Sequence, residues 1–170
     1  DKSGLDVAND SLIRIAYNYY AKHPKDSLYA RCMYYMGVYY SLSDSLEWAN
    51  YCLDVAAQEA KVQKDTATLC LVWSKNSWVG RKTNAPLGLK YANQALAVYR
   101  KYSQATPLNT IYYILLKGEC ERLCGKSQEA LSGSKEAERI ALALGDSATL
   151  SNVYQDMSCF AAGAHDAKAV

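Results

Sequence analysis

Apolar residues recur at helical spacing along most of the chain, and polar or turn-forming residues interrupt them at regular intervals. In the first stretch, 6–22, one face carries Ala8, Leu12, Ile15, Ala16 and Tyr19. The same periodicity predicts further helices at about 27–41, 44–61, 65–82, 86–103, 107–124, 127–144 and 146–162. No stretch alternates as a half-buried strand does. The pattern therefore predicts an all-α protein.

Capping residues and breakers mark the expected helix ends. Asp and Ser or Thr open three of the helices, and Asp44 with Glu47 has the spacing of a capping box. Ser127 is expected to cap the helix that it begins, and Pro86 and Pro107 suit first turns. Glycines are expected to end three helices, at positions 125, 145 and 163. From His165 onward, a ninth helix is expected to begin.

A spacing of twelve residues between two small residues occurs three times. The pairs are Gly37 and Ala49, Gly80 and Ala92, and Gly118 and Ala130. Each pair places one small residue midway along a first helix and the other early in a second. Helices approach closely only where side chains are small, so the repetition predicts repeated close crossings of paired helices.

On these residues the chain resembles the tetratricopeptide repeat (TPR) family. The first pair fits the family pattern best, with Met33, Met36, Gly37, Tyr40, Ala49, Leu53 and Ala56 at its large and small positions. Later pairs depart from it, with polar residues at Asn76, Thr83, Lys117, Glu121 and Ser134, so looser packing is expected there. The resemblance implies one repeat domain over 1–170, a right-handed α-solenoid. Its helix pairs would span 27–61, 65–103, 107–144 and, in part, 146–170, after an extra helix at 6–22.

The composition argues against some classes of partner but does not identify the partner. The net charge is +2, from 19 basic and 17 acidic residues, which is too balanced to favour nucleic acid as the partner. No apolar run approaches the roughly 18–20 residues that a membrane span needs. The six cysteines fall inside helical patterns without a CxxC, so we expect free, buried thiols. Because the first residue is Asp, a processed or excised form is expected. The predicted repeats end partway through a helix pair at Val170, so we expect that the natural protein continues or that the exposed end pairs with another copy.

The sequence offers no recognisable catalytic centre. Its two histidines, His23 and His165, lie far apart, and the common hydrolase, metalloprotease, P-loop and dinucleotide patterns are missing. Carboxylates are scattered, and Cys and His do not converge at metal-ligand spacing. We therefore expect a protein without enzymatic activity, cofactor or metal.

The aromatic residues, 15 Tyr and three Trp, are the feature of the sequence that most favours a binding surface. The family resemblance implies a concave groove lined by first helices, and tyrosine, tryptophan and arginine suit an interface. Its partner-binding residues would be Arg31, Tyr34, Tyr35, Trp78, Arg81, Tyr112, Glu119, Arg122, Asn152 and Gln155.

The function expected from this groove is a scaffold that binds a protein or peptide. The alternatives are a sensory or regulatory module of a larger envelope or transcription-regulating protein, and a glycan-binding groove. An exposed repeat end would also offer a surface for homodimerisation. The tyrosine-rich style resembles repeat regions of bacterial cell-envelope proteins, which favours a periplasmic protein or lipoprotein over a cytoplasmic one.

Overall fold

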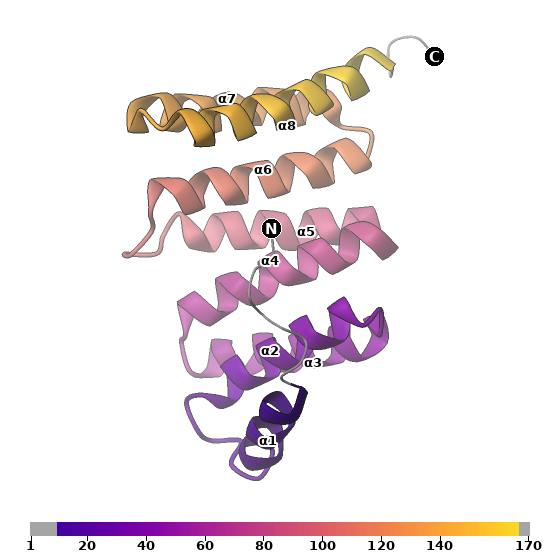
Figure 1. The fold of residues 1–170 in the computed structure, drawn as a ribbon, viewed down its shortest axis with the longest axis vertical. Coiled ribbons are helices and arrows are strands. Elements are labelled where there is room, and N and C mark those ends of the chain that lie inside the picture. Colours follow the sequence, from indigo (N-terminus) through magenta and orange to yellow (C-terminus); the bar gives the residue numbers. More distant parts are fainter. Residues whose placement is uncertain (1–9, 167–170) are drawn as a thin grey trace. The chain divides into compact units, whose positions relative to one another are not determined.

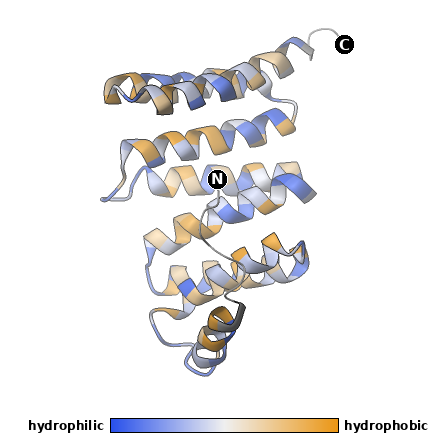
Figure 2. Ribbon diagram, in the orientation of Figure 1, coloured by the Kyte–Doolittle hydropathy of each residue, from blue (hydrophilic) through white to orange (hydrophobic). Residues whose placement is uncertain are grey.

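The computed structural model describes residues 10–166, and these residues form eight α-helices and no strand (Figure 1). The all-α prediction is therefore confirmed. The helices are α1 Asp10–Tyr20, α2 Tyr29–Leu42, α3 Leu46–Val62, α4 Thr66–Thr83, α5 Ala85–Tyr99, α6 Pro107–Leu123, α7 Ser127–Leu144 and α8 Ser147–Asp166. Figure 2 shows hydrophobic and hydrophilic residues interleaved along the helical ribbons, as expected for amphipathic helices. Residues 6–9 of the predicted first helix lie outside the described range.

The chain divides into two compact units, Asp1–Lys75 (unit 1) and Asn76–Val170 (unit 2), with the division inside α4. The expectation of a single repeat domain stays a prediction. Among the described residues, no helix combines the length and apolarity that crossing a bilayer requires.

In unit 1, α2 and α3 lie side by side and share a core (Figure 1). Large side chains from both helices are fully buried there, including Met33 and Leu53. A Cβ added at Gly37 would lie 2.6 Å from Leu53 Cγ and 3.3 Å from the carbonyl oxygen of Ala49, so this crossing depends on glycine. The apolar periodicity of 44–61 also includes Trp48, and the prediction that its side chain belongs to the buried stripe is wrong, because Trp48 is 60% exposed.

Unit 2 contains the other two predicted crossings, and the glycines meet different partners there. A Cβ at Gly80 would lie 2.8 Å from both the Cα and the backbone nitrogen of Gly88, so α4 and α5 meet backbone to backbone. A Cβ at Gly118 would lie 2.8 Å from the ring of Phe160 on α8. Ala130 is fully buried, but the close approach at Gly118 is to α8 and not to α7.

Several helix ends follow the predicted caps. The side chain of Asp65 accepts a hydrogen bond from the backbone N–H of Thr68, at 3.0 Å. Thr106 Oγ1 accepts one from Asn109 N–H at 3.3 Å, directly before Pro107. Gly125 and Gly145 adopt positive φ angles of 74° and 66°, the conformation expected after a helix end.

Other predicted boundaries are wrong, each for a local reason. Asp44 has a φ of 53°, so it lies in the turn after α2, and the expected capping box with Glu47 does not form. Ser127 is buried in the first turn of α7, and Lys126 occupies the cap position. Gly163 does not end α8, which continues to Asp166. A Cβ at Gly163 would lie 2.7 Å from Ser127 Oγ, so close packing explains this glycine.

Among the polar residues that depart from the repeat pattern, Thr83 is exposed, and Asn76 is buried with no hydrogen-bond partner for Nδ2 among the described residues. Glu121 and Ser134 are buried with partners. Glu121 is 7% exposed and pairs with Lys117 one turn earlier on α6. Ser134 is 1% exposed and donates a hydrogen bond to the carbonyl oxygen of Leu131. Glu121 and Ser134 thus enter the interior with their polar atoms satisfied, which removes most of the cost of burying them.

All six cysteines are free thiols, as predicted. Cys32, Cys52, Cys70 and Cys120 are buried, whereas Cys124 is half-buried and Cys159 is exposed, against the expectation of burial for all. Burial raises the pKa of Cys52 and of Cys70 to about 11. These two thiols are therefore protonated at neutral pH and act as small apolar core residues.

Candidate functional site

Unit 2 contains an open groove of about 750 Å³ between the C-terminal part of α4, α6 and α8. We call it the unit 2 groove. Its walls are made by Trp78, Arg81, Tyr112, Leu115, Leu116, Glu119, Arg122, Asp156, Cys159, Ala162 and Gly163. The groove thus combines two aromatic rings, two guanidinium groups and two carboxylates on a partly apolar floor.

Five of the ten predicted binding residues lie together in this groove: Trp78, Arg81, Tyr112, Glu119 and Arg122. On α6, positions 112, 119 and 122 recur at about helical period, so one face of the helix presents all three. On α4, positions 78 and 81 are one turn apart. Helical spacing accounts for the grouping within each helix, whereas the prediction that both helices line one groove rests on the family resemblance.

Glu119 and Arg122 form the best-defined ion pair of the groove. Nε and Nη2 of Arg122 donate to the two carboxylate oxygens of Glu119, both at 2.8 Å. These hydrogen bonds hold the pKa of Glu119 below its ordinary value and raise that of Arg122. A bidentate pair fixes the orientation of both planar groups, so it gives the groove wall a defined shape.

Asp156 differs from Glu119, because the pKa of its carboxyl group is raised and not lowered. Burial raises the pKa of its carboxyl group, and the nearby charge of Glu119 raises it further. Within the described part of the chain, no cation lies at ion-pair distance from this carboxylate. Asp156 therefore enters the groove as an acid whose ionised form is not neutralised, a state that a cationic ligand group would relieve.

Trp78 carries two cations against its ring. Lys82 Nζ lies 4.2 Å from the ring centroid, and the guanidinium carbon of Arg81 lies 5.9 Å from it. Such cation–π contacts hold the ring in place. Among the described residues, Arg81 has no carboxylate at ion-pair distance, so its N–H donors remain available for a ligand.

The sequence missed the contribution of α8. The predicted residues Asn152 and Gln155 are exposed and do not line the groove. Instead, α8 contributes Asp156, Cys159 and Gly163, which recur three and four residues apart. Moving one position along a helix rotates a side chain by about 100°, so a small error of register selects the wrong face. The fourth repeat matched the family pattern poorly, and that weakness was the only signal.

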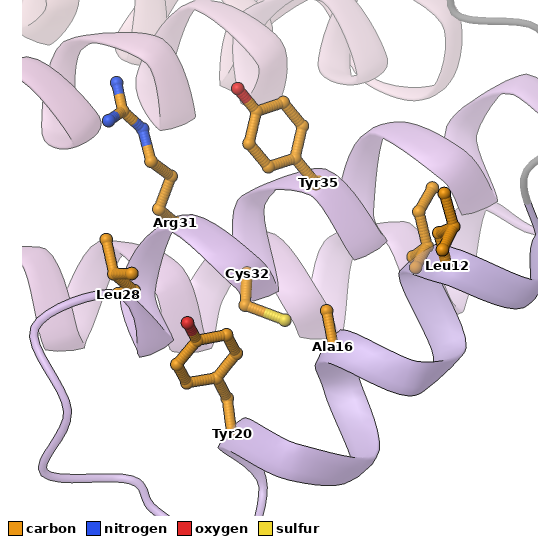
Figure 3. Close-up of a pocket in the computed structure, with 8 residues that line it drawn as sticks. Leu12, Ala16, Tyr20, Leu28, Arg31, Cys32 and Tyr35 are labelled. Atoms are coloured by element: carbon orange, nitrogen blue, oxygen red, sulfur yellow. The ribbon is translucent and has the colours of Figure 1, made fainter.

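The other predicted residues belong to unit 1. Arg31 and Tyr35 line a second hollow of about 400 Å³ between α1 and α2, which we call the unit 1 pocket (Figure 3). Tyr34 is half-buried and is not part of its lining, although its ring lies 5.2 Å from that of Tyr35. Of the ten predicted binding residues, five line the unit 2 groove, two line the unit 1 pocket, and Tyr34, Asn152 and Gln155 line neither.

No protein-family model matches the chain, and no curated protein sequence is significantly similar to it. The geometry of the two hollows is therefore the basis for assigning a function. Among the described residues, no group of three or more His, Cys, Asp or Glu side chains is arranged to hold a metal ion. What the groove does provide is stacking surface, guanidinium donors and carboxylate acceptors, which are the elements of noncovalent recognition.

Proposed function

We propose that the chain is a non-catalytic scaffold that binds a protein or peptide segment through the unit 2 groove. The observation that carries this proposal is the presence of Trp78, Tyr112, Arg81 and Arg122 in one open groove. Tryptophan, tyrosine and arginine dominate the energetics of protein interfaces because they combine a large contact area with directed polar groups.

The size and shape of the groove suit an extended or helical peptide. One wall is α6, whose 17 residues extend for about 25 Å at 1.5 Å per residue. Its polar groups alternate with apolar ones such as Leu115 and Leu116. A peptide satisfies both kinds of surface, since its backbone and side chains provide donors, acceptors and apolar contacts together.

The charges of the groove indicate which peptide it prefers. Arg81 is available to an acidic group of the ligand, and Asp156 to a basic one. Glu119 and Arg122 neutralise each other and contribute shape rather than net charge. The preferred segment therefore carries both an acidic and a basic side chain, with an apolar or aromatic residue to pack against Trp78 and Tyr112.

The helix pairs further suggest that the chain is a TPR-like array, a right-handed α-solenoid. Adjacent antiparallel helices, a glycine at three helix crossings and polar caps between helices support this proposal. Small-angle X-ray scattering of the chain would test it, because a solenoid gives a more elongated distance distribution than a globule of 170 residues. A distribution typical of a globule would contradict the solenoid.

The binding proposal is tested by selecting ligands from a phage-displayed random peptide library on the full chain. We expect selected peptides to carry charges of both signs, and Trp78→Ala to weaken their binding at least tenfold. Trp48→Ala is the matched control, because Trp48 is an exposed tryptophan of unit 1 outside both hollows. Circular dichroism checks that both variants fold. Equal affinities for the two variants would refute the assignment of the groove.

A further inference from the structure

The unit 1 pocket has a chemistry different from that of the groove. It lies between α1 and α2, where the side chain of Cys32 points toward Ala16 (Figure 3), and Leu12 and Ile13 also line it. Tyr20, Leu28 and Tyr35 enclose the sides. Burial raises the pKa of the Cys32 thiol, as expected for a group removed from water. The lining is therefore an apolar trough of about 400 Å³.

Polar groups occur at one edge of this pocket. Figure 3 shows the guanidinium of Arg31 and the hydroxyl of Tyr35 on the same side, both rising from α2 away from α1. Among the described lining residues, Arg31 is the only charged one. Within the described range it has no carboxylate at ion-pair distance. The pocket thus presents a cation and a hydroxyl donor beside an apolar floor.

Asp26 and Asp65 lie near the pocket but outside its lining, and each accepts a backbone hydrogen bond, Asp26 in the turn before α2 and Asp65 at the start of α4. Asp26 Oδ1 accepts from the backbone N–H of Leu28 at 2.8 Å. Asp65 accepts from Thr68 N–H, and its pKa is lowered, against the effect of burial, by the hydrogen bonds of Thr68 and by the charge of Arg31. Arg31 therefore acts on Asp65 through its charge, and no described side chain forms an ion pair with its N–H donors.

We propose that the unit 1 pocket binds a free monocarboxylate with a linear apolar tail, of the class of medium-chain fatty acids. The tail lies between α1 and α2, against Leu12, Ala16 and Cys32. The carboxylate accepts hydrogen bonds from Arg31 and Tyr35 at the edge. The match rests on charge complementarity, because a single cation and no lining carboxylate favour one negative charge at one end of an otherwise apolar ligand.

The test is a titration of the full chain, by isothermal calorimetry, with hexanoate, octanoate, decanoate and dodecanoate below their micellar concentrations. We expect saturable binding that tightens about fourfold with each added methylene and then levels off once the pocket is full. Decanol should bind at least tenfold more weakly than decanoate, because it lacks the charge that pairs with Arg31. Binding that never saturates, or equal binding of acid and alcohol, would overturn the proposal.

Variants separate the pocket from a general apolar surface. Arg31→Gln should abolish the preference for decanoate over decanol, whereas Arg14→Gln removes a charge from α1 outside the lining and should leave it unchanged. Ala16→Phe should block the tail and shift the plateau to shorter chains. If Ala16→Phe does not fold, the comparison of Arg31→Gln with Arg14→Gln still tests whether Arg31 binds the carboxylate.

Two further outcomes keep this inference distinct from the peptide groove. Trp78→Ala should leave decanoate binding intact, because Trp78 belongs to the other hollow. If the pocket instead takes amphipathic helical peptides and no fatty acid, it is a protein-docking surface and the proposal fails. Loss of peptide binding in the groove would not affect the fatty-acid result, so the two proposals fail separately.

Discussion

The two hollows use similar residue types and end with opposite chemistry. Both contain arginine, tyrosine and aliphatic side chains on α-helices. In the unit 1 pocket, α1 supplies only apolar residues and tyrosine, so a single cation remains at the edge. In the unit 2 groove, α8 supplies Asp156 and Cys159, so charges of both signs face the ligand. The helix that closes each hollow, rather than the one carrying the arginine, therefore decides which ligand class it can accept.

The arginines of the two hollows also differ, because one is held in an ion pair and the other is not. Arg122 is held by two hydrogen bonds to Glu119 and forms part of the groove wall. Arg31 has no such partner among the described residues and is exposed at the pocket edge. A paired arginine gives a rigid shape, and an unpaired one gives an available charge. The comparison predicts that the groove selects by fit and the pocket by charge.

The largest expected effect comes from removing a core residue that packs behind the unit 2 groove while leaving the unit 1 pocket unchanged. Phe160 is 1% exposed and packs on Gly118, so it joins α8 to α6 behind the groove. Phe160→Ala should lower the free energy of unfolding of unit 2 by about 3–5 kcal/mol. Hydrogen exchange should show lost protection in α6 and α8 and little change in α2 and α3. Uniform loss across both units would show that they unfold together.

A smaller effect is expected where α4 and α5 meet. Gly80→Ala forces a Cβ against the backbone of Gly88, which cannot move aside as a side chain can, and should cost about 1–3 kcal/mol. Gly133→Ala is the matched control, because a Cβ there meets nothing within 4 Å inside α7. It should stabilise by up to about 1 kcal/mol. Urea unfolding measures both, and a destabilised Gly133→Ala variant would contradict the packing described.

The smallest expected change in the free energy of unfolding concerns the two carboxylates of the unit 2 groove, Glu119 and Asp156. Glu119 has a lowered pKa, so its stabilisation is present above its unfolded pKa of about 4.3 and is lost as the pH falls through the folded value. Asp156 has a raised pKa, so any favourable contribution is present only below its unfolded value of about 3.9 and is lost as the pH rises through the folded one. At pH 7, Glu119 therefore stabilises the protein and Asp156 does not.

These signs predict opposite mutational effects. At pH 7, Glu119→Gln should lower the free energy of unfolding by about 0.5–1 kcal/mol, a modest value because the pair is partly solvated. Asp156→Asn should leave it unchanged or slightly raised. Each difference should shrink as the pH falls through the folded pKa of the carboxylate concerned. Chemical denaturation at several pH values measures this, and a loss of stability in Asp156→Asn at pH 7 would contradict an unneutralised carboxylate.

Local features were predictable from the sequence because they depend on neighbouring residues. The caps at Asp65 and Thr106 and the positive φ angles of Gly125 and Gly145 follow from side chains within a few positions. Asp44 shows the limit of such reasoning. Aspartate both caps helices and tolerates the left-handed conformation, and here the second property prevails because the chain must turn after α2.

Features that depend on packing between helices were predicted less well. The grouping on α6 was found because three residues share one helix face, but Asp156 depends on how α8 is rotated against α6. In the same way, the spacing to Ala130 pointed to α7, whereas the partner of Gly118 is Phe160, forty-two residues away. Such contacts depend on how the surfaces of two helices fit together. The periodicity of apolar residues within one helix does not specify this fit.

The contact between Gly80 and Gly88 has a consequence for how this chain can change over generations. At Gly37 and Gly118 the closest obstacle to a larger residue is a side chain, so a compensating change at Leu53 or Phe160 would relieve most of the clash, with the carbonyl oxygen of Ala49 at 3.3 Å still close to Gly37. At Gly80 and Gly88 each added Cβ would meet main-chain atoms within 2.8 Å, which no second substitution removes. The first two glycines can therefore covary with a partner, whereas the pair joining α4 and α5 admits no replacement without separating the helices.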